Sequence, residues 1–221
     1  MFPIPPPVAP DPDSELEGGQ LIRAECMCGG VIFPVRRPSD SASGTVRQPF
    51  KGRAARLNAA VGRDKWVAQL DVSDDIRLTT GANLMAWMTV PTPFGFANGL
   101  GFDGRVDSRV KVYQVLGPGR KGRSKVGFCG GCGATCFSFS NRMVEEEDGE
   151  TGVLRVAMGI LRAFADGEAD LLAEEWVEWD GEVLGEEEGR EYDGGFMERL
   201  LVGFKKWVEE SGNGIKGLGF W

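Results

Sequence analysis

The sequence predicts a mainly β fold with long loops and one amphipathic helix near the C-terminal end. Glycine (33 residues) and proline (12) are abundant in the 221-residue chain, and a turn-rich composition suits short strands better than a helical bundle. Short apolar or alternating runs between turn signals predict strands along most of the chain. Helical periodicity is confined to the last part of the sequence.

Composition and charge narrow the class of protein. Hydrophobic residues make up 42% and charged residues 26% of the chain, which is ordinary for one globular domain. No stretch approaches the roughly 20 apolar residues of a membrane-spanning helix, so no membrane partner is expected. The formal net charge of -8 disfavours nucleic acid as a partner. Histidine is absent, so any metal must be bound by cysteine or oxygen ligands.

The first residues, MFPIPPPVAPDPDSELEGG, lack the basic n-region and the apolar h-region of a secretory signal. We therefore expect a cytoplasmic protein in a reducing compartment, where paired cysteines more often indicate a metal than a disulfide. The prolines of this segment exclude a helix or a central strand, so residues 1–19 are expected to form a disordered arm. No feature predicts an oligomeric state.

A β domain is expected over residues 20–182, followed by an acidic linker and a helix over 183–221. The first element of the domain is a hairpin at 20–37, in which Gly29 and Gly30 supply the turn. The remaining segments are long loops at 37–64 and 92–108, a basic turn at 117–125, and strands at 65–72, 83–92, 110–116, 136–140, 152–163 (one strand or a pair) and 174–183.

Residues 195–214 have the periodicity of an amphipathic helix. Lysine and glutamate side chains lie on its polar side, and this mixed charge favours packing on the chain's own domain over membrane binding. The acidic runs EEEDGE and GEEEGRE are expected to be solvated loops. The apolar stripe comprises Met197, Leu200, Leu201, Phe204, Trp207 and Val208.

Two short cysteine pairs, about a hundred residues apart, predict a metal site. Cys26-Met-Cys28 lies in the predicted hairpin, and Cys129-Gly-Gly-Cys132 leads into a strand. Four thiolates can surround one Zn²⁺ ion tetrahedrally, and such a closed shell is structural. The alternatives are a redox pair, which no βαβ pattern supports, and simple core packing, which the paired spacing disfavours. Cys136 is expected to be a buried thiol that binds no metal.

Four motifs carry a family resemblance. They are C-x-C-G-G from Cys26, T-T-G-A from Thr79, A-W-M-x-V-P from Ala86 and F-C-G-x-C-G-A-x-x-F from Phe128. With them, the segment from about Leu21 to Trp179 resembles the glutathione-dependent formaldehyde-activating (GFA) family and the related centromere-protein-V-like proteins. The resemblance implies a zinc-stabilised β-tent fold in which the two cysteine pairs bind one structural zinc ion. It also implies a carbon–sulfur lyase-type activity that joins formaldehyde and glutathione.

The family's second, catalytic zinc is held by C-x-C-x-x-C followed by R-x-x-T-G, and here the three thiols are missing. Asp71, Ser73 and Ile76 stand in their places, although Arg77 begins a matching continuation. Isoleucine cannot ligate, serine is a poor ligand, and aspartate supplies hard oxygen instead of soft sulfur. We therefore expect a GFA-like scaffold with one structural zinc, whose family activity is lost or altered, and which could still bind a small molecule or a thiol.

The alternative is a repurposed enzyme that works without a metal. Asp71, Ser73, Asp74, Asp75 and Arg77 would then perform acid–base chemistry on a small organic substrate, since neighbouring carboxylates raise one another's pKa. A plainer interpretation is that Asp74 and Asp75 face solvent or cap a turn. An interaction protein acting through its acidic tail has no support beyond charge.

Overall fold

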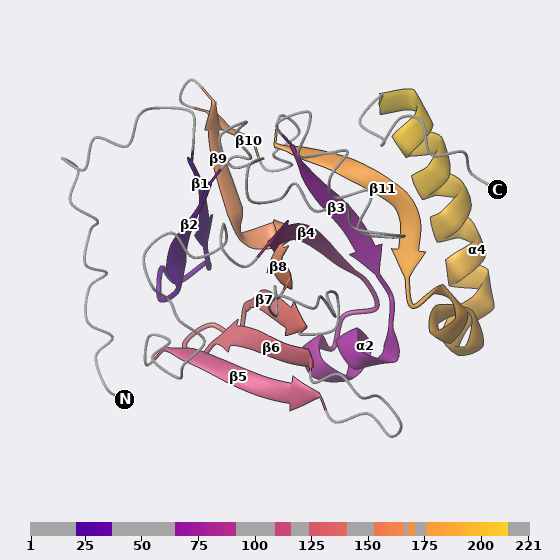
Figure 1. Ribbon diagram of the computed structural model, residues 1–221. Helices are drawn as coiled ribbons and strands as arrows, with labels where there is room; N and C mark the ends of the chain where they lie inside the picture. The colour runs from indigo at the N-terminus through magenta and orange to yellow at the C-terminus, as the bar shows by residue number, and fades with distance from the viewer. Residues whose placement is uncertain are drawn as a thin grey trace, which may run out of the picture.

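The computed structural model describes residues 21–36, 65–91, 109–115, 124–140, 153–165, 168–170 and 176–211. These residues form two β-sheets and two α-helices (Figure 1), which confirms the predicted mainly β class. The arm at 1–19, the long loops at 37–64 and 92–108 and most of the turn at 117–125 lie outside the described residues. Within the described part, no helix is long and apolar enough to cross a membrane.

The larger sheet has the strand order β11-β3-β4-β8-β7-β6-β5. β11 runs parallel to β3, and the other neighbouring strands are antiparallel. Each strand overlaps a predicted strand segment except β6, which was not predicted and begins inside the predicted basic turn. The strands are β3 (Trp66–Asp71), β4 (Met85–Pro91), β5 (Val110–Val115), β6 (Ser124–Cys129), β7 (Thr135–Ser140), β8 (Val153–Ala157) and β11 (Val177–Leu184).

The smaller sheet has the order β10-β9-β1-β2. Its centre is the predicted hairpin, β1 (Leu21–Glu25) and β2 (Ile32–Arg36), which pairs with β9 (Leu161–Ala165). The predicted pair at 152–163 is confirmed, but its strands belong to different sheets: a single 3₁₀ turn at Met158–Ile160 carries the chain from β8 to β9. The three-residue strand β10 (Glu168–Asp170) was not predicted.

A short helix, α2 (Asp74–Thr80), follows β3 where the sequence predicts only a turn. The two aspartates of its first turn suit the positive end of the helix dipole. Gly81 ends the helix in the left-handed conformation (φ 72°) and donates its N–H to the Arg77 carbonyl. Seven residues are too few to show the apolar periodicity by which a helix is recognised in a sequence.

The C-terminal helix α4 (Glu186–Ser211) begins earlier than predicted. The acidic run GEEEGRE, expected to be a solvated loop in the linker, instead forms its first turns, because glutamates are favoured at the positive end of a helix dipole. The backbone departs from helical geometry at Asp193 (φ -149°, ψ 89°), and Asp193 Oδ1 accepts the Phe196 N–H at 2.8 Å. This capping bond marks the start of the amphipathic segment that the sequence predicts from residue 195.

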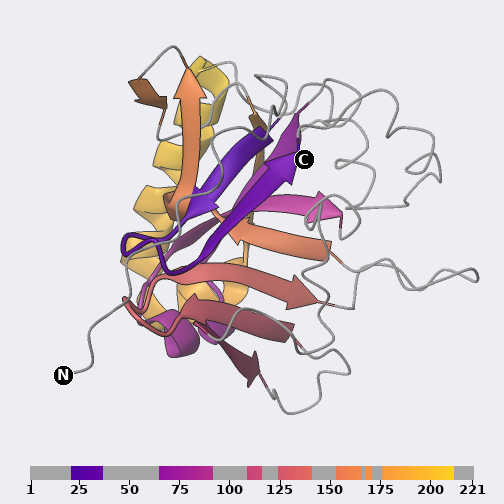
Figure 2. The same cartoon turned by 90° about the vertical axis from the view of Figure 1, so that its left-hand side faces the viewer.

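α4 packs against β11 at one edge of the larger sheet (Figure 1). Trp179 of β11 meets the rings of Phe204 and Trp207 edge to face, with centroid separations of 5.7 and 5.4 Å. Such aromatic pairs contribute about 0.5–1.5 kcal/mol each beyond the burial of their area. Figure 2 shows the β1–β2 hairpin on the near side of the molecule and α4 on the far side.

Candidate functional site

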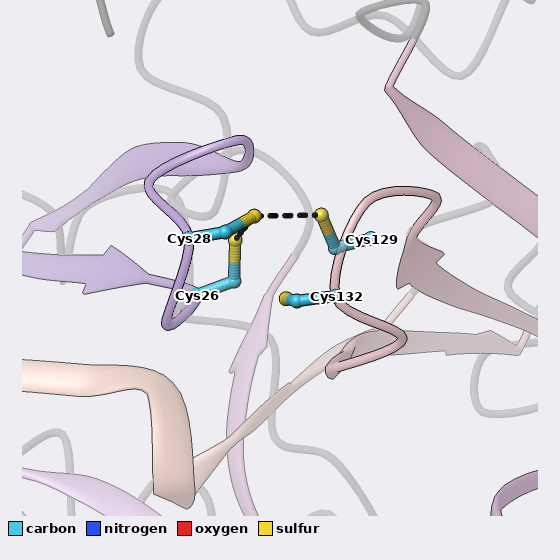
Figure 3. Close-up of side chains that lie close together, drawn as sticks. All are labelled: Cys26, Cys28, Cys129 and Cys132. Carbon is cyan, nitrogen blue, oxygen red and sulfur yellow. Dashed lines mark hydrogen bonds between the residues drawn. The ribbon is translucent and has the colours of Figure 1, made fainter. Parts of the chain in front are cut away.

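The structure brings the four predicted metal ligands together from two turns remote in sequence (Figure 3). Cys26 and Cys28 lie in the turn between β1 and β2, while Cys129 ends β6 and Cys132 lies in the turn before β7. Their sulfur atoms all lie within 4.8 Å of one another. The Sγ atoms of Cys26 and Cys28 are 3.6 Å apart, and those of Cys28 and Cys129 are 3.5 Å apart.

Backbone hydrogen bonds shape both turns so that the sulfurs converge. In the first turn, the Cys26 N–H donates to the Val31 carbonyl at 3.1 Å, and the Val31 N–H donates back to Cys26 Sγ at 3.2 Å. In the second, the Cys129 N–H donates to the Ala134 carbonyl at 2.9 Å, and the Gly131 N–H donates to Cys129 Sγ at 3.4 Å. These bonds fix the positions of the Cys26 and Cys129 sulfur atoms within the two turns.

Gly30 lets the two turns approach each other closely. A Cβ atom at this position would lie 3.2 Å from the sulfurs of both Cys28 and Cys129. The backbone of the first turn therefore forms a wall of the sulfur cluster, and a side chain at residue 30 would crowd two of its four donors. This explains in physical terms why glycine follows the C-x-C pair.

Two thiols of the cluster have shifted pKa values. A hydrogen bond from the Ala134 amide lowers the pKa of the Cys132 thiol to about 7. The Gly30 amide lowers the pKa of Cys28, but the sulfurs of Cys129 and Cys132, which share protons with it, raise it to about 12. The cluster thus supplies one thiolate near neutral pH and retains protons that a metal ion would displace.

Cys136 lies outside the four-sulfur cluster, as predicted. Its thiol is buried and donates to the Ala134 carbonyl at 3.2 Å. Burial and the neighbouring Cys26 and Cys129 raise its pKa to about 12. A buried thiol that stays protonated does not compete for the metal.

The donor set fits zinc. All five cysteines are free, and four sulfurs 2.3 Å from a central Zn²⁺ in a tetrahedron would lie about 3.8 Å from one another. The separations of 3.5 Å between Cys28 and Cys129 and 3.6 Å between Cys26 and Cys28 are close to this value. The cluster can therefore hold a metal ion, and four sulfur ligands leave no position open for substrate.

Residues 71–77, the predicted catalytic segment, do not form a cluster of ligands like that of the four cysteines. Asp71 ends β3 and is buried, with 4% of its surface exposed. Its Oδ1 accepts the Ser73 N–H at 3.0 Å, and its Oδ2 lies 3.7 Å from Nη1 of Arg155. Ile76, at the third thiol position of the family motif, is buried in the hydrophobic core. Of the motif positions, only Asp71 therefore combines burial with a charged partner.

Asp74 and Arg77 lie at the junction between α2 and α4. The Arg77 guanidinium donates to the Val72 carbonyl and to the Asp74 carboxylate, and it lies over the Tyr192 ring, 4.4 Å from the centroid. The Asp74 N–H donates to Glu188 Oε2 of α4 at 2.7 Å. Asp75, one residue further along α2, is half-buried. Arg77 and Asp74 thus tie the two helices together, a role that the sequence did not predict.

A second group of polar side chains was not predicted from the sequence. The buried polar residues of the described part all lie on one face of the larger sheet, which we call the polar sheet face: Gln69, Asp71, Thr89, Ser138, Glu178 and Asp180. The strand registers place Arg155 and the indole of Trp87 on the same face. Alternating runs such as WVAQLD and FSFS were the available signal, but such alternation is typical of a face exposed to water.

Comparisons of the chain with protein-family models, with curated proteins and with solved structures found no match.

Proposed function

We propose that Cys26, Cys28, Cys129 and Cys132 hold one zinc ion with a structural role. The observation that carries this proposal is the convergence of four soft donors from two turns within 4.8 Å. Zinc is the usual metal for a four-thiolate tetrahedron, and a closed shell leaves it without a site for substrate. Bound there, the ion would fasten the β1–β2 hairpin to the turn between β6 and β7, which belongs to the other sheet.

The chain would on this proposal be a divergent relative of the GFA family that keeps the structural zinc and has lost the catalytic one. Asp71, Ser73 and Ile76 offer no set of three soft ligands, and Ile76 is an apolar side chain of the hydrophobic core. A metal that polarises a carbonyl contributes several kcal/mol to catalysis, and each ~1.4 kcal/mol changes the rate tenfold. The family's carbon–sulfur lyase-type reaction is therefore expected to run at the uncatalysed rate.

Two measurements test this. Elemental analysis should find one zinc ion per chain, and a second tightly bound ion would contradict the assignment of residues 71–77. Zinc-loaded protein mixed with glutathione and formaldehyde should form S-hydroxymethylglutathione no faster than buffer does. Clear acceleration by the wild-type protein would overturn the loss of the catalytic site.

A second candidate function is acid–base catalysis without a metal, and one observation favours Asp71 for it. Asp71 is buried beside Arg155, whereas Asp74 is exposed and Arg77 is engaged between the helices. A buried carboxylate with a cationic partner is a common arrangement in active sites. If the protein is such an enzyme, Asp71→Asn should abolish turnover of its substrate while zinc content and folding are retained. Arg77→Ala should instead lower stability through the α2–α4 junction.

A further inference from the structure

The polar sheet face is unusual because it is buried. On the opposite face of the same strands, the side chains are apolar and belong to the hydrophobic core, for example Ala68, Met88 and Val156. Strand register links the polar face across the sheet: Glu178 lies opposite Val67, Val67 opposite Thr89, Thr89 opposite Arg155, and Arg155 opposite Ser138. A polar layer inside a protein is stable only if its groups are hydrogen-bonded.

Some polar groups of the polar sheet face are paired with one another. Gln69 donates its side-chain N–H to Asp180 Oδ2 at 2.8 Å, and the Glu182 N–H donates to Asp180 Oδ1 at 3.2 Å. Arg155 lies near Asp71, as described above, so the guanidinium compensates this carboxylate. The remaining carboxylate, Glu178, lies two strands from Thr89 and thus about 10 Å away.

Two neighbouring groups at the centre of the face are not satisfied. Among the described residues, Trp87 Nε1 and Thr89 Oγ1 are buried and have no hydrogen-bond partner. The two residues are 0% and 2% exposed. They lie two positions apart on β4, so their side chains point to the same side of the sheet. Leaving each such group unpaired costs about 1–3 kcal/mol, and two adjacent ones are costly unless another molecule pairs with them.

We infer that the polar sheet face binds a small molecule through a carbonyl or carboxylate oxygen, held by Trp87 Nε1 and Thr89 Oγ1. The indole N–H can only donate a hydrogen bond, and the threonine hydroxyl can donate one as well, so the missing partner must be an acceptor. Arg155 lies directly across from Thr89 in the strand register, and its guanidinium is paired with the Asp71 carboxylate on the same face. This inference does not depend on the cysteine site, which draws on other residues.

Ligand binding at the polar sheet face can be tested by following the indole N–H signals of the zinc-loaded full chain in ¹H–¹⁵N spectra. Trp87→Phe identifies the Trp87 signal by its loss, and the signals of Trp179 on β11 and Trp207 on α4, whose rings contact each other, serve as internal controls. Acetate and acetamide are the probes. We expect saturable movement of the Trp87 signal, with acetate acting more strongly for a carboxylate site and acetamide for a carbonyl site. No movement with either probe would overturn the inference.

Two substitutions of Thr89 distinguish a hydroxyl that binds a ligand from a hydroxyl that is simply unpaired. Thr89→Val removes the hydroxyl and keeps the shape of the side chain, so the protein should become more stable. The affinity for the probe should fall by a factor of about ten or more. Thr89→Ser should retain binding. Unchanged probe affinity in Thr89→Val would overturn the inference, because it would mean that Thr89 serves no ligand. Zinc content measured on each variant shows whether any loss arises instead from the cysteine site.

Discussion

The sulfur atoms of Cys28 and Cys129 lie 3.5 Å apart, although 101 positions separate them in the chain. Closing a loop of that length costs about 4 kcal/mol in chain entropy, before any constant term. Among the described strands, β1 reaches the rest of the protein through a short ladder of two residue pairs with β9, at Arg23 and Ala24. The cysteine cluster is thus a further attachment of the hairpin, beside this ladder and the hairpin side chains that are buried in the hydrophobic core. The free energy of metal binding there would add directly to the free energy of folding.

Removal of one ligand should therefore cost more than removal of the neighbouring free thiol. Cys129→Ser should give protein that is insoluble or free of zinc, because the remaining three sulfurs no longer close the tetrahedron. Cys136→Ser, in the adjacent strand, should keep its zinc and lose little stability. Elemental analysis and thermal unfolding of both variants measure this. Zinc loss in Cys136→Ser with retention in Cys129→Ser would show that the ligands are wrongly assigned.

Chelation should loosen one part of the fold first. With the metal removed, we expect hydrogen exchange to speed up mainly at the hairpin amides of β1 and β2, since their remaining ladder to the rest of the protein is short. The central strands β3 and β4, which are paired along their whole length, should stay protected. Exchange read by mass spectrometry before and after chelation shows the difference. Equal acceleration in both regions would mean that the cluster supports the whole fold instead of the hairpin.

Zinc affinity should fall as the pH falls, with a bend near neutrality. Binding displaces the protons that the four thiols still carry. The pKa of Cys28 is raised to about 12, so its proton is displaced throughout the neutral range. The pKa of Cys132 is lowered to about 7, so this thiol adds a further proton only at lower pH.

The logarithm of the affinity should therefore change with pH more steeply below pH 7 than above it, by about one proton per zinc ion. Competition with a chromophoric chelator at several pH values on each side of neutrality measures the slope. Cys136→Ser is the control and should give the same curve. A single slope through neutrality would contradict the role of Cys132.

Most of the strands and the two cysteine turns were predictable because each depends on local spacing. Alternation and turn residues located β3, β4 and β8, and the C-x-C and C-x-x-C pairs placed two sulfurs on each turn regardless of what surrounds them. The predicted start of α4 was wrong because the acidic residues before the Asp193 cap are helical but have no apolar periodicity. The helix α2 and strand β10 were missed because both are too short for a period to appear.

Burial of the polar sheet face was not predictable for a different reason. Gln69, Thr89 and Ser138 alternate with apolar neighbours just as they would on a solvated sheet. Whether such a face meets water or protein depends on tertiary packing, which local pattern does not contain. The roles of Asp74 and Arg77 at the junction of α2 and α4 are likewise set by contacts across more than a hundred residues.

Gly185 joins β11 to α4 and lies against the backbone at the start of α2. Gly185 has a φ of 72°, and a Cβ atom there would lie 2.5 Å from the Ser73 Cα and 2.6 Å from its backbone nitrogen. The obstacle is backbone at the start of α2, so no side chain can move aside, and Gly185→Ala should lower the free energy of unfolding by about 2 kcal/mol or more. Gly203, on the exposed side of α4, has no atom within 4 Å of an added Cβ. The same substitution there should raise the free energy of unfolding by about 0.5–1 kcal/mol, because alanine favours a helix interior over glycine. Urea unfolding of the two variants and the wild type measures both changes in the free energy of unfolding. If Gly185→Ala unfolds at the wild-type midpoint, then the close approach of α2 to the start of α4 is not a fixed feature of the fold.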